Sequence, residues 1–171
     1  AVLTVTYGSG KDRHRAAYAQ ETDIITKPVD GSLMVEGWDE NTGWARTQYW
    51  GFGPEALPIQ GRVWYPDGDG PFPLVLMVHG NHSMEEFSDS GYAYIGKLLA
   101  SRGIILVSVD QNFLNSSFSS RLDDGRRPWT MELDARGWLL LEHLKVWDTW
   151  NNQPDNPFFG RVDMDRIALM G

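Results

Sequence analysis

The sequence predicts an α/β fold in which a mostly parallel sheet is flanked by helices. Two short apolar runs, residues 74–78 and 104–109, are hydrophobic on both faces, as strands buried within a parallel sheet are. Segments with apolar residues at helical spacing separate these runs from each other and from a third run at residues 167–170. A succession of strand, helix, strand, helix and strand at this spacing implies right-handed crossovers and therefore parallel neighbours.

The segments around the first apolar run carry signals of their own. The stretch LPIQGRVWYP, residues 57–66, is typical of a strand, and DGDGPFP is a Gly/Pro-rich turn that leads directly into the run at 74–78. Asp89 and Ser90 then open a helix of about three turns, and Gly103 stands where a C-terminal cap belongs. The apolar positions of this helix are Tyr92, Ile95, Leu98 and Leu99.

A longer helix is predicted to begin at Thr130 and to continue to residue 151, with Glu132 and Asp134 in its first turn. One stripe of this helix carries Leu133, Leu140, Leu144 and Trp147. The polar segment before it, residues 111–129, is too long for a simple connection, and its part at residues 115–127 is open to two interpretations. Either a substrate rim or lid or a disordered loop fits this segment.

Residues 1–56 are predicted to form a mainly β extension packed on a main domain of residues 57–171. Strands are expected in AVLTVTYGSG, DIITKPVDGSLMVEGW and ARTQYWGFG, because these stretches combine turn signals with Thr, Val and aromatic residues. No motif in the extension indicates a chemical role, so it is assigned only packing and pocket-rim contacts.

The composition excludes several classes of function. The net charge of -8 disfavours binding to nucleic acid or to an anionic membrane, since both need clustered Lys and Arg. The absence of cysteine excludes disulfides, thiolate metal sites and a cysteine nucleophile. The apolar runs are far shorter than the roughly 20 residues that span a bilayer, so no membrane segment is expected. The cellular compartment stays open.

The predicted sheet also indicates where a site should lie. In a parallel sheet, ligands bind beyond the carboxyl ends of the strands. Those ends are His79-Gly80-Asn81-His82, Asp110 with the loop after it, and Gly171. We therefore expect the functional residues among these positions.

Two stretches resemble the α/β-hydrolase family. GRVWYPDGDGPFPLVLMVHGNHS, residues 61–83, resembles the family's antiparallel strand, turn, and strand that ends in the His-Gly oxyanion loop. FFGRVDMDRIALMG, residues 158–171, resembles the stretch leading into the nucleophile elbow, where a strand is followed by Gly-x-Ser-x-Gly. The resemblance covers residues 57–171 and is closest to lipases and esterases of the dienelactone-hydrolase-like or cutinase-like branch.

The resemblance implies a serine hydrolase of carboxylic esters or related acyl bonds that works through an acyl-enzyme without a cofactor. Gly171 would be the first glycine of the elbow, so the nucleophile, the acid and the base are expected beyond Gly171. The strand at 167–170 would be central in the complete sheet and, without the missing C-terminal half of the domain, an exposed apolar edge. The 171-residue chain alone is accordingly predicted to be inactive.

The resemblance also implies which residues form the oxyanion loop. The backbone N–H of Asn81, with His82 as the second choice, is expected to stabilise the oxyanion, while His79 and Gly80 hold the loop. An ordinary strand-to-loop turn is the alternative. A dyad between His82 and Ser83 is not expected, since neighbouring residues on a tight loop rarely face each other.

Other polar and aromatic residues are given supporting roles. Asp110 is expected to anchor its own loop, because the acid of the family follows a later strand. Asp163 and Asp165 are expected to cap backbone N–H groups and to pair with Arg166. Two carboxylates without further ligands do not fill a calcium shell, so no metal site is predicted. The candidates for the substrate pocket are Ser83, Glu85, Phe87, Phe113 and Leu114.

Two other classes of function are alternatives to an enzyme that acts on a small ester or acyl substrate. A non-catalytic module that binds a ligand or a protein through its cleft and some of its eight tryptophans would keep the same sheet. A dinucleotide-binding domain is disfavoured, because HGNHSM lacks the Gly-x-Gly-x-x-Gly pattern.

Overall fold

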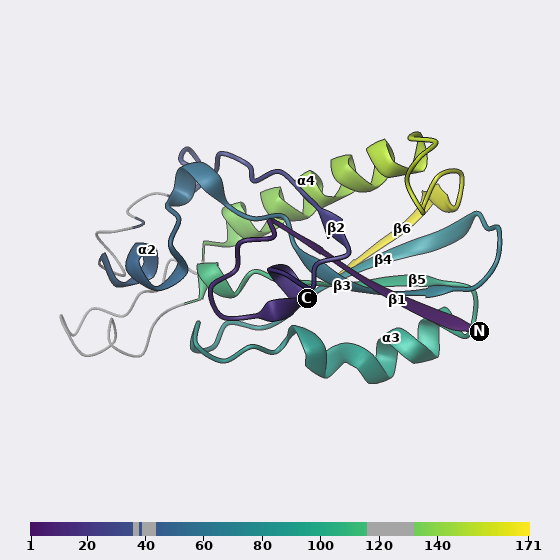
Figure 1. The fold of residues 1–171 in the computed structure, drawn as a ribbon, viewed down its shortest axis with the longest axis horizontal. Helices are drawn as coiled ribbons and strands as arrows, with labels where there is room; N and C mark the ends of the chain where they lie inside the picture. Colours follow the sequence, from purple (N-terminus) through teal and green to yellow (C-terminus); the bar gives the residue numbers. More distant parts are fainter. Residues whose placement is uncertain (36–37, 39–43, 116–131) are drawn as a thin grey trace.

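The computed structural model describes residues 1–35, 38, 44–115 and 132–171, and its centre is a six-stranded sheet between two helices (Figure 1). Helix α3 (Ala93–Ala100) covers one face and helix α4 (Leu133–Asn151) covers the other. The strands are β1 (Val2–Gly8), β2 (Ile24–Ile25), β3 (Gly61–Pro66), β4 (Phe72–Val78), β5 (Ile105–Val109) and β6 (Val162–Met170).

The strand order is β2-β1-β3-β5-β4-β6, and the neighbours confirm the predicted arrangement. Strand β4 runs parallel to both β5 and β6, whereas β3 is antiparallel to β1 and β5. The carboxyl ends of β4, β5 and β6 therefore lie at the same edge of the sheet. This edge brings His79, Asp110 and Gly171 toward one region, as the sequence predicts.

Both faces of the central strands are buried, and alternate residues serve the two faces. In β4, Leu74 and Leu76 belong to the larger core under α4, while Val75 and Met77 belong to the smaller core under α3. Trp147 of α4 is fully buried in the larger core. This double burial is the physical reason why the strands are continuously apolar instead of alternating.

The N-terminal segment contains less strand than the sequence analysis expects. The first expected strand is confirmed as β1, but the second is reduced to β2, only two residues long. The third expected strand is wrong, because residues 44–50 form helix α2 (Trp44–Trp50). Its buried side chains Arg46 and Trp50 are four residues apart, so packing of one helical face overrides the strand preference of the aromatic residues.

Strand β1 is part of the same sheet as the rest of the fold. It pairs with β3 along its length, from Val2 opposite Pro66 to Tyr7 opposite Gly61. The hydroxyl of the fully buried Tyr7 and Nδ1 of His143 in α4 share a 2.6 Å hydrogen bond. Burial lowers the pKa of His143 to about 3, so this ring is neutral. The division of the chain into domains at residue 57 stays a prediction.

The two flanking helices follow the predicted spacing with two corrections, one of which is Leu98 of α3, which is 47% exposed. Gly103 has a φ of +83° and the N–H of Ile104 donates to the carbonyl of Leu99, which confirms the glycine cap after α3. The stripe predicted for α4 is wrong at Leu133, which is 63% exposed. The predicted start at Thr130 lies outside the described residues. The buried face of α4 instead carries Ala135, Arg136, Leu139, Leu140, His143, Trp147 and Trp150.

Leu133 is exposed for a geometric reason. It precedes Ala135 by two residues, which corresponds to about 200° around a helix, so it points away from the buried face. No helix in the described ranges is long and apolar enough to cross a membrane.

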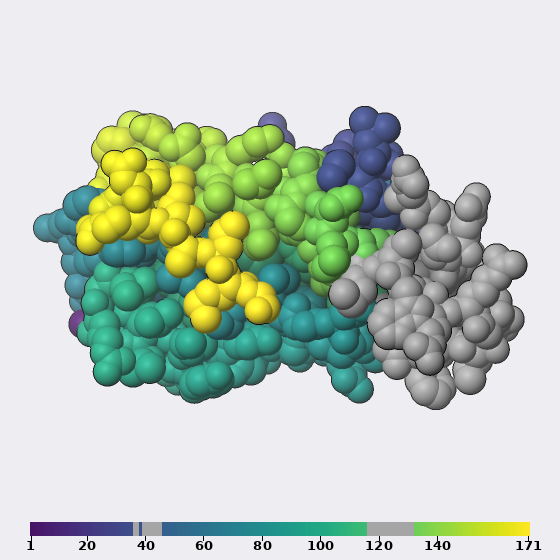
Figure 2. Space-filling view, turned by 180° about the vertical axis from the view of Figure 1, so that it is seen from behind, coloured from purple at the N-terminus to yellow at the C-terminus, as the bar shows by residue number. Residues whose placement is uncertain are grey.

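Strand β6 lies at the edge of the sheet and pairs with β4 alone among the strands that the structure describes. Its apolar side chains are open to solvent, with Ile167 36%, Leu169 49% and Met170 41% exposed. Figure 2 shows the yellow C-terminal residues on the surface, between the green α4 and the teal segment below. The expected exposed apolar edge is thus confirmed, while a central place for β6 in a larger sheet stays a prediction.

We predict that Gly96→Ala destabilises the chain while Gly137→Ala does not. A Cβ at Gly96 would lie 2.4 Å from the Trp64 ring, so the substitution should cost about 1–3 kcal/mol of unfolding free energy. A Cβ at Gly137, an exposed position in α4, meets no described atom within 4 Å, and alanine there should add about 0.5–1 kcal/mol. Guanidinium chloride unfolding of both variants measures the difference. Equal effects would contradict the close packing of α3 on Trp64.

Candidate functional site

The loop after β4 is held by the side chain of His79. This buried imidazole accepts a 2.9 Å hydrogen bond at Nε2 from the N–H of Gln111, so its proton is on Nδ1, which donates to the carbonyl of Gly80 at 2.9 Å. Burial lowers the pKa of His79, although the nearby Asp110 carboxylate acts in the opposite direction. The neutral ring therefore joins the ends of β4 and β5.

The loop after β5 forms the base of the same site. The amide of the fully buried Asn112 donates a 2.6 Å hydrogen bond to the carbonyl of Glu86. The amide of Asn115 lies 3.5 Å from the carbonyl of Gly80, and its oxygen accepts a 2.7 Å hydrogen bond from Arg136 of α4. Residues 79–88 are thus fixed on a buried polar scaffold.

The predicted oxyanion donors lie on the outer side of this loop. Asn81 is exposed, and the backbone N–H groups of Asn81 and His82 have no hydrogen-bond acceptor among the described residues. The His82 ring bonds the carbonyl of Ser83 through Nδ1 and the hydroxyl of Ser88 through Nε2, both at 2.9 Å. The hydroxyl of Ser83 donates instead to Glu85, so His82 and Ser83 form no dyad. The oxyanion role itself stays a prediction.

The pocket candidates separate into two groups. Ser83 and Phe87 are half-buried and Glu85 is exposed, so these three lie at the surface beside the loop. Phe113 and Leu114 are 0% and 3% exposed and lie in the core of the described structure, so their place in a substrate pocket stays a prediction. A 3-10 turn (Asn112–Leu114) follows β5 and buries both side chains in the larger core.

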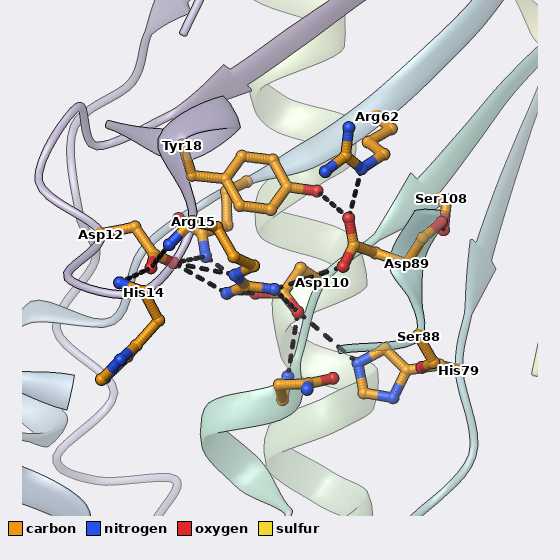
Figure 3. Close-up of polar contacts among 12 residues, drawn as sticks. Asp12, His14, Arg15, Tyr18, Arg62, His79, Ser88, Asp89, Ser108 and Asp110 are labelled. Carbon is orange, nitrogen blue, oxygen red and sulfur yellow. Dashed lines mark hydrogen bonds and ion pairs between the residues drawn. The ribbon is translucent and has the colours of Figure 1, made fainter. Parts of the chain in front are cut away.

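A buried ionic cluster lies behind the site and is centred on Arg15 (Figure 3). Its guanidinium donates to both carboxylate oxygens of Asp110, at 2.8 and 2.7 Å, and to Asp12 at 2.8 Å. A third carboxylate, Asp89, accepts hydrogen bonds from Tyr18 and from the guanidinium of Arg62. The cluster thus connects the N-terminal segment to the loops after β4 and β5.

The charge state of Asp110 depends on this cluster. Complete burial would raise the pKa of its carboxyl, but the charge and hydrogen bonds of Arg15 outweigh burial and lower the pKa to about 2. One oxygen of Asp110 also accepts the N–H of Asn112 at 3.3 Å, which confirms its predicted role as a loop anchor. The sequence analysis missed Arg15, since its partner Asp110 is 95 residues away.

Of the two carboxylates at the start of β6, Asp163 takes the predicted role, whereas the Asp165 carboxylate has no such partner among the described residues. Asp163 accepts the N–H of Asp165 at 3.0 Å and pairs with Arg166 at 2.6 Å. Within the described parts of the chain, no group of three or more His, Asp or Glu side chains is placed to hold a metal ion.

Several curated relatives match the chain over 69% of its length, among them two that are both named "Esterase FrsA". The protein from Shigella boydii serotype 18 is 33% identical over 119 residues, which are 69% of this chain and 23% of that protein. The protein from Escherichia coli O157:H7 is 31% identical over 118 residues, again 69% of this chain and 23% of the relative. Over these residues the chain is similar to proteins named as esterases, which supports the resemblance to the α/β-hydrolase superfamily. The narrower dienelactone-hydrolase-like or cutinase-like assignment stays a prediction.

The other comparisons add less. A solved structure, a CE15 glucuronoyl esterase from Teredinibacter turnerae, is 15% identical with a TM-score of 0.39 and covers 67% of this chain and 30% of that one. No family model matches the chain. The chain spans about a quarter of the length of the curated relatives that it matches.

We predict that Arg15→Met lowers the unfolding free energy by about 3–5 kcal/mol at pH 7, because buried carboxylates lose their partner. Arg166→Met is the matched control, since that guanidinium is 62% exposed, and its effect should stay within about 0.5 kcal/mol. Urea unfolding measures both.

The pH dependence of this penalty follows from Asp110. Its lowered pKa in the folded protein stabilises that state above the unfolded value of about 3.9, and the benefit is lost as the pH falls toward 2. In Arg15→Met the buried pair of Asp110 and His79 takes up a proton more easily, so the difference from the wild type in unfolding free energy should narrow between pH 7 and about 4. A penalty that is constant over this range would contradict the assignment.

Proposed function

We propose that this chain is the N-terminal part of a serine hydrolase that cleaves carboxylic esters, or related acyl bonds, through an acyl-enzyme. The observation that carries the proposal is the loop after β4, where the N–H of Asn81 is unpaired among the described residues while His79 is locked underneath. The similarity to proteins named as esterases supports a role for this N–H in ester hydrolysis. A preorganised N–H donor is what a tetrahedral oxyanion requires.

The register between β4 and β6 supports the place of the nucleophile. Met77 lies opposite Met170, and a Cβ at Gly171 would be 3.2 Å from Val78. The residues that follow β6 would therefore begin beside the oxyanion loop. A serine two positions after Gly171, on a Gly-x-Ser-x-Gly turn, would lie within reach of an acyl group held by Asn81.

The proposed mechanism assigns one half of the site to this chain. The serine transfers its proton to the base and attacks the ester carbonyl, and the negative charge that develops on the oxygen is stabilised by the N–H of Asn81. Collapse of this intermediate breaks the ester C–O bond and releases the alcohol, which takes its proton from the base. Water then hydrolyses the acyl-enzyme, which releases the carboxylic acid and regenerates the serine. The nucleophile, the acid and the base are proposed to come from a further part of the same domain. The open apolar edge of β6 is consistent with such a part packing there.

A non-catalytic binding module on the same scaffold is the second candidate. It would use surface tryptophans, yet Trp38, Trp50, Trp64, Trp147 and Trp150 are all buried. The residue two positions after Gly171 in the full-length protein separates the two candidates, since any residue other than serine there removes the enzyme hypothesis.

In the full-length protein, we predict that Asn81→Pro lowers kcat by about 100-fold or more, because proline removes the proposed N–H donor. Asn81→Ala keeps that N–H and should change kcat by no more than about threefold. Hydrolysis of p-nitrophenyl esters gives both values, and thermal unfolding verifies that the loop variants are folded. A similar loss in both variants would assign the effect to the side chain and contradict the proposed donor.

We also predict that the 171-residue chain by itself neither hydrolyses p-nitrophenyl esters nor reacts with a fluorophosphonate probe. The physical reason is that the oxyanion donors alone supply no nucleophile. Intact mass spectrometry after incubation with the probe is the measurement, with the full-length protein as the positive control. Stoichiometric labelling of the shorter chain would show that its nucleophile had been misplaced.

A further inference from the structure

The charge on Asp110 bears directly on the ring that holds the loop after β4. Nε2 of His79 lies 3.9 Å from one oxygen of Asp110, and both side chains are almost fully buried. The same Nε2 accepts the hydrogen bond from the N–H of Gln111. One nitrogen atom therefore faces a backbone donor and a carboxylate at once.

These two neighbours favour opposite protonation states of the His79 ring. An N–H of Gln111 needs an unprotonated Nε2, since a protonated nitrogen has no lone pair to accept with. A bare carboxylate at this distance favours a proton on Nε2, because an imidazolium would be attracted to it. The hydrogen bond that joins β4 and β5 thus persists only while the charge of Asp110 is balanced.

Arg15 supplies that balance. Its guanidinium bonds both oxygens of Asp110 and is only 7% exposed, so water screens the pair weakly. Arg62 is hydrogen-bonded to Asp89. Without Arg15, the cluster would hold Asp12, Asp89 and Asp110 against Arg62 alone.

We propose that Arg15 is a positioning residue for the oxyanion loop: by neutralising Asp110 it keeps His79 neutral, so that His79 goes on accepting the N–H of Gln111. The catalytic consequence rests on the function proposed above, whereas the coupling between the charges does not. The N-terminal segment thereby takes part in shaping the site instead of only packing beside it.

The other charged groups near His79 act in one direction. Arg136 of α4 disfavours a proton on the ring, and so does His82, whose ring centroid is 5.2 Å away across the loop. Burial disfavours the charged ring most strongly. Asp110 is the charged side chain that favours protonation, assisted by the hydrogen bond to the Gly80 carbonyl, so the partner of Asp110 influences the protonation state of His79.

The test is the protonation of His79 in the 171-residue chain, followed by the ¹⁵N chemical shifts of its ring. In the wild type we expect an unprotonated Nε2 and a protonated Nδ1 between about pH 5 and 8. In Arg15→Met the protonation midpoint of His79 should rise by about one pH unit or more. Arg15→Met/Asp110→Asn is the matched control and should return Nε2 to its unprotonated state, which a packing role for Arg15 would not do.

A second variant keeps the test decisive if Arg15→Met fails to fold. Arg15→Met/Asp12→Asn removes one of the carboxylates left bare but retains Asp110, so it should show the same raised midpoint for His79. A midpoint that is unchanged in the folded variants, or one that stays raised after Asp110→Asn is added, would overturn the proposal.

The catalytic consequence is measured separately in the full-length protein. Arg15→Met should lower kcat for p-nitrophenyl esters about tenfold more at pH 6 than at pH 8, with KM nearly unchanged, and adding Asp110→Asn should restore the flat profile. If His79 titrates as expected but the full-length wild type hydrolyses no ester, the proposed function fails and the coupling stands. If the wild type is active but His79 does not respond, the coupling fails alone.

Discussion

The bidentate ion pair between Arg15 and Asp110 is the contact on which the arrangement of the candidate site depends. Asp110 ends a central strand, is completely buried, and holds a backbone N–H of the loop that follows. A carboxylate in that position is tolerated only because a guanidinium bonds both of its oxygens. The N-terminal segment, through Arg15, is therefore required to balance the negative charge of Asp110 at the carboxyl edge of the sheet.

The sheet gives this cluster its rigid support. Strands β4 and β5 are buried on both faces, so their carboxyl ends cannot shift without disturbing two cores at once. The loops that leave them are then joined by His79 and Asn112, both buried and both hydrogen-bonded to backbone groups of the opposite loop. These hydrogen bonds hold the loop that carries the backbone N–H groups of Asn81 and His82 in one conformation.

Local pattern was a good guide wherever burial alone decides structure. Apolar runs predicted β4, β5 and β6, and Gly103 predicted the cap of α3, because each signal reflects a constraint within a few residues. Local pattern wrongly predicted a strand where α2 lies and a buried side chain at Leu133. In both places the buried face of the element depends on which other elements pack against it. The structure places Phe113 in the core, and a sequence by itself does not distinguish a pocket wall from a core.

The sequence by itself determined the parallel α/β sheet, the place of the His79 loop at its carboxyl edge, and the resemblance to hydrolases. These properties follow from hydrophobic period and short motifs, which are local. Only the tertiary structure decided that Arg15 neutralises Asp110 and that Tyr7 bonds His143. Such partners are 95 and 136 residues apart, and a buried charge or hydroxyl selects its partner by proximity in the folded chain, which no local pattern encodes.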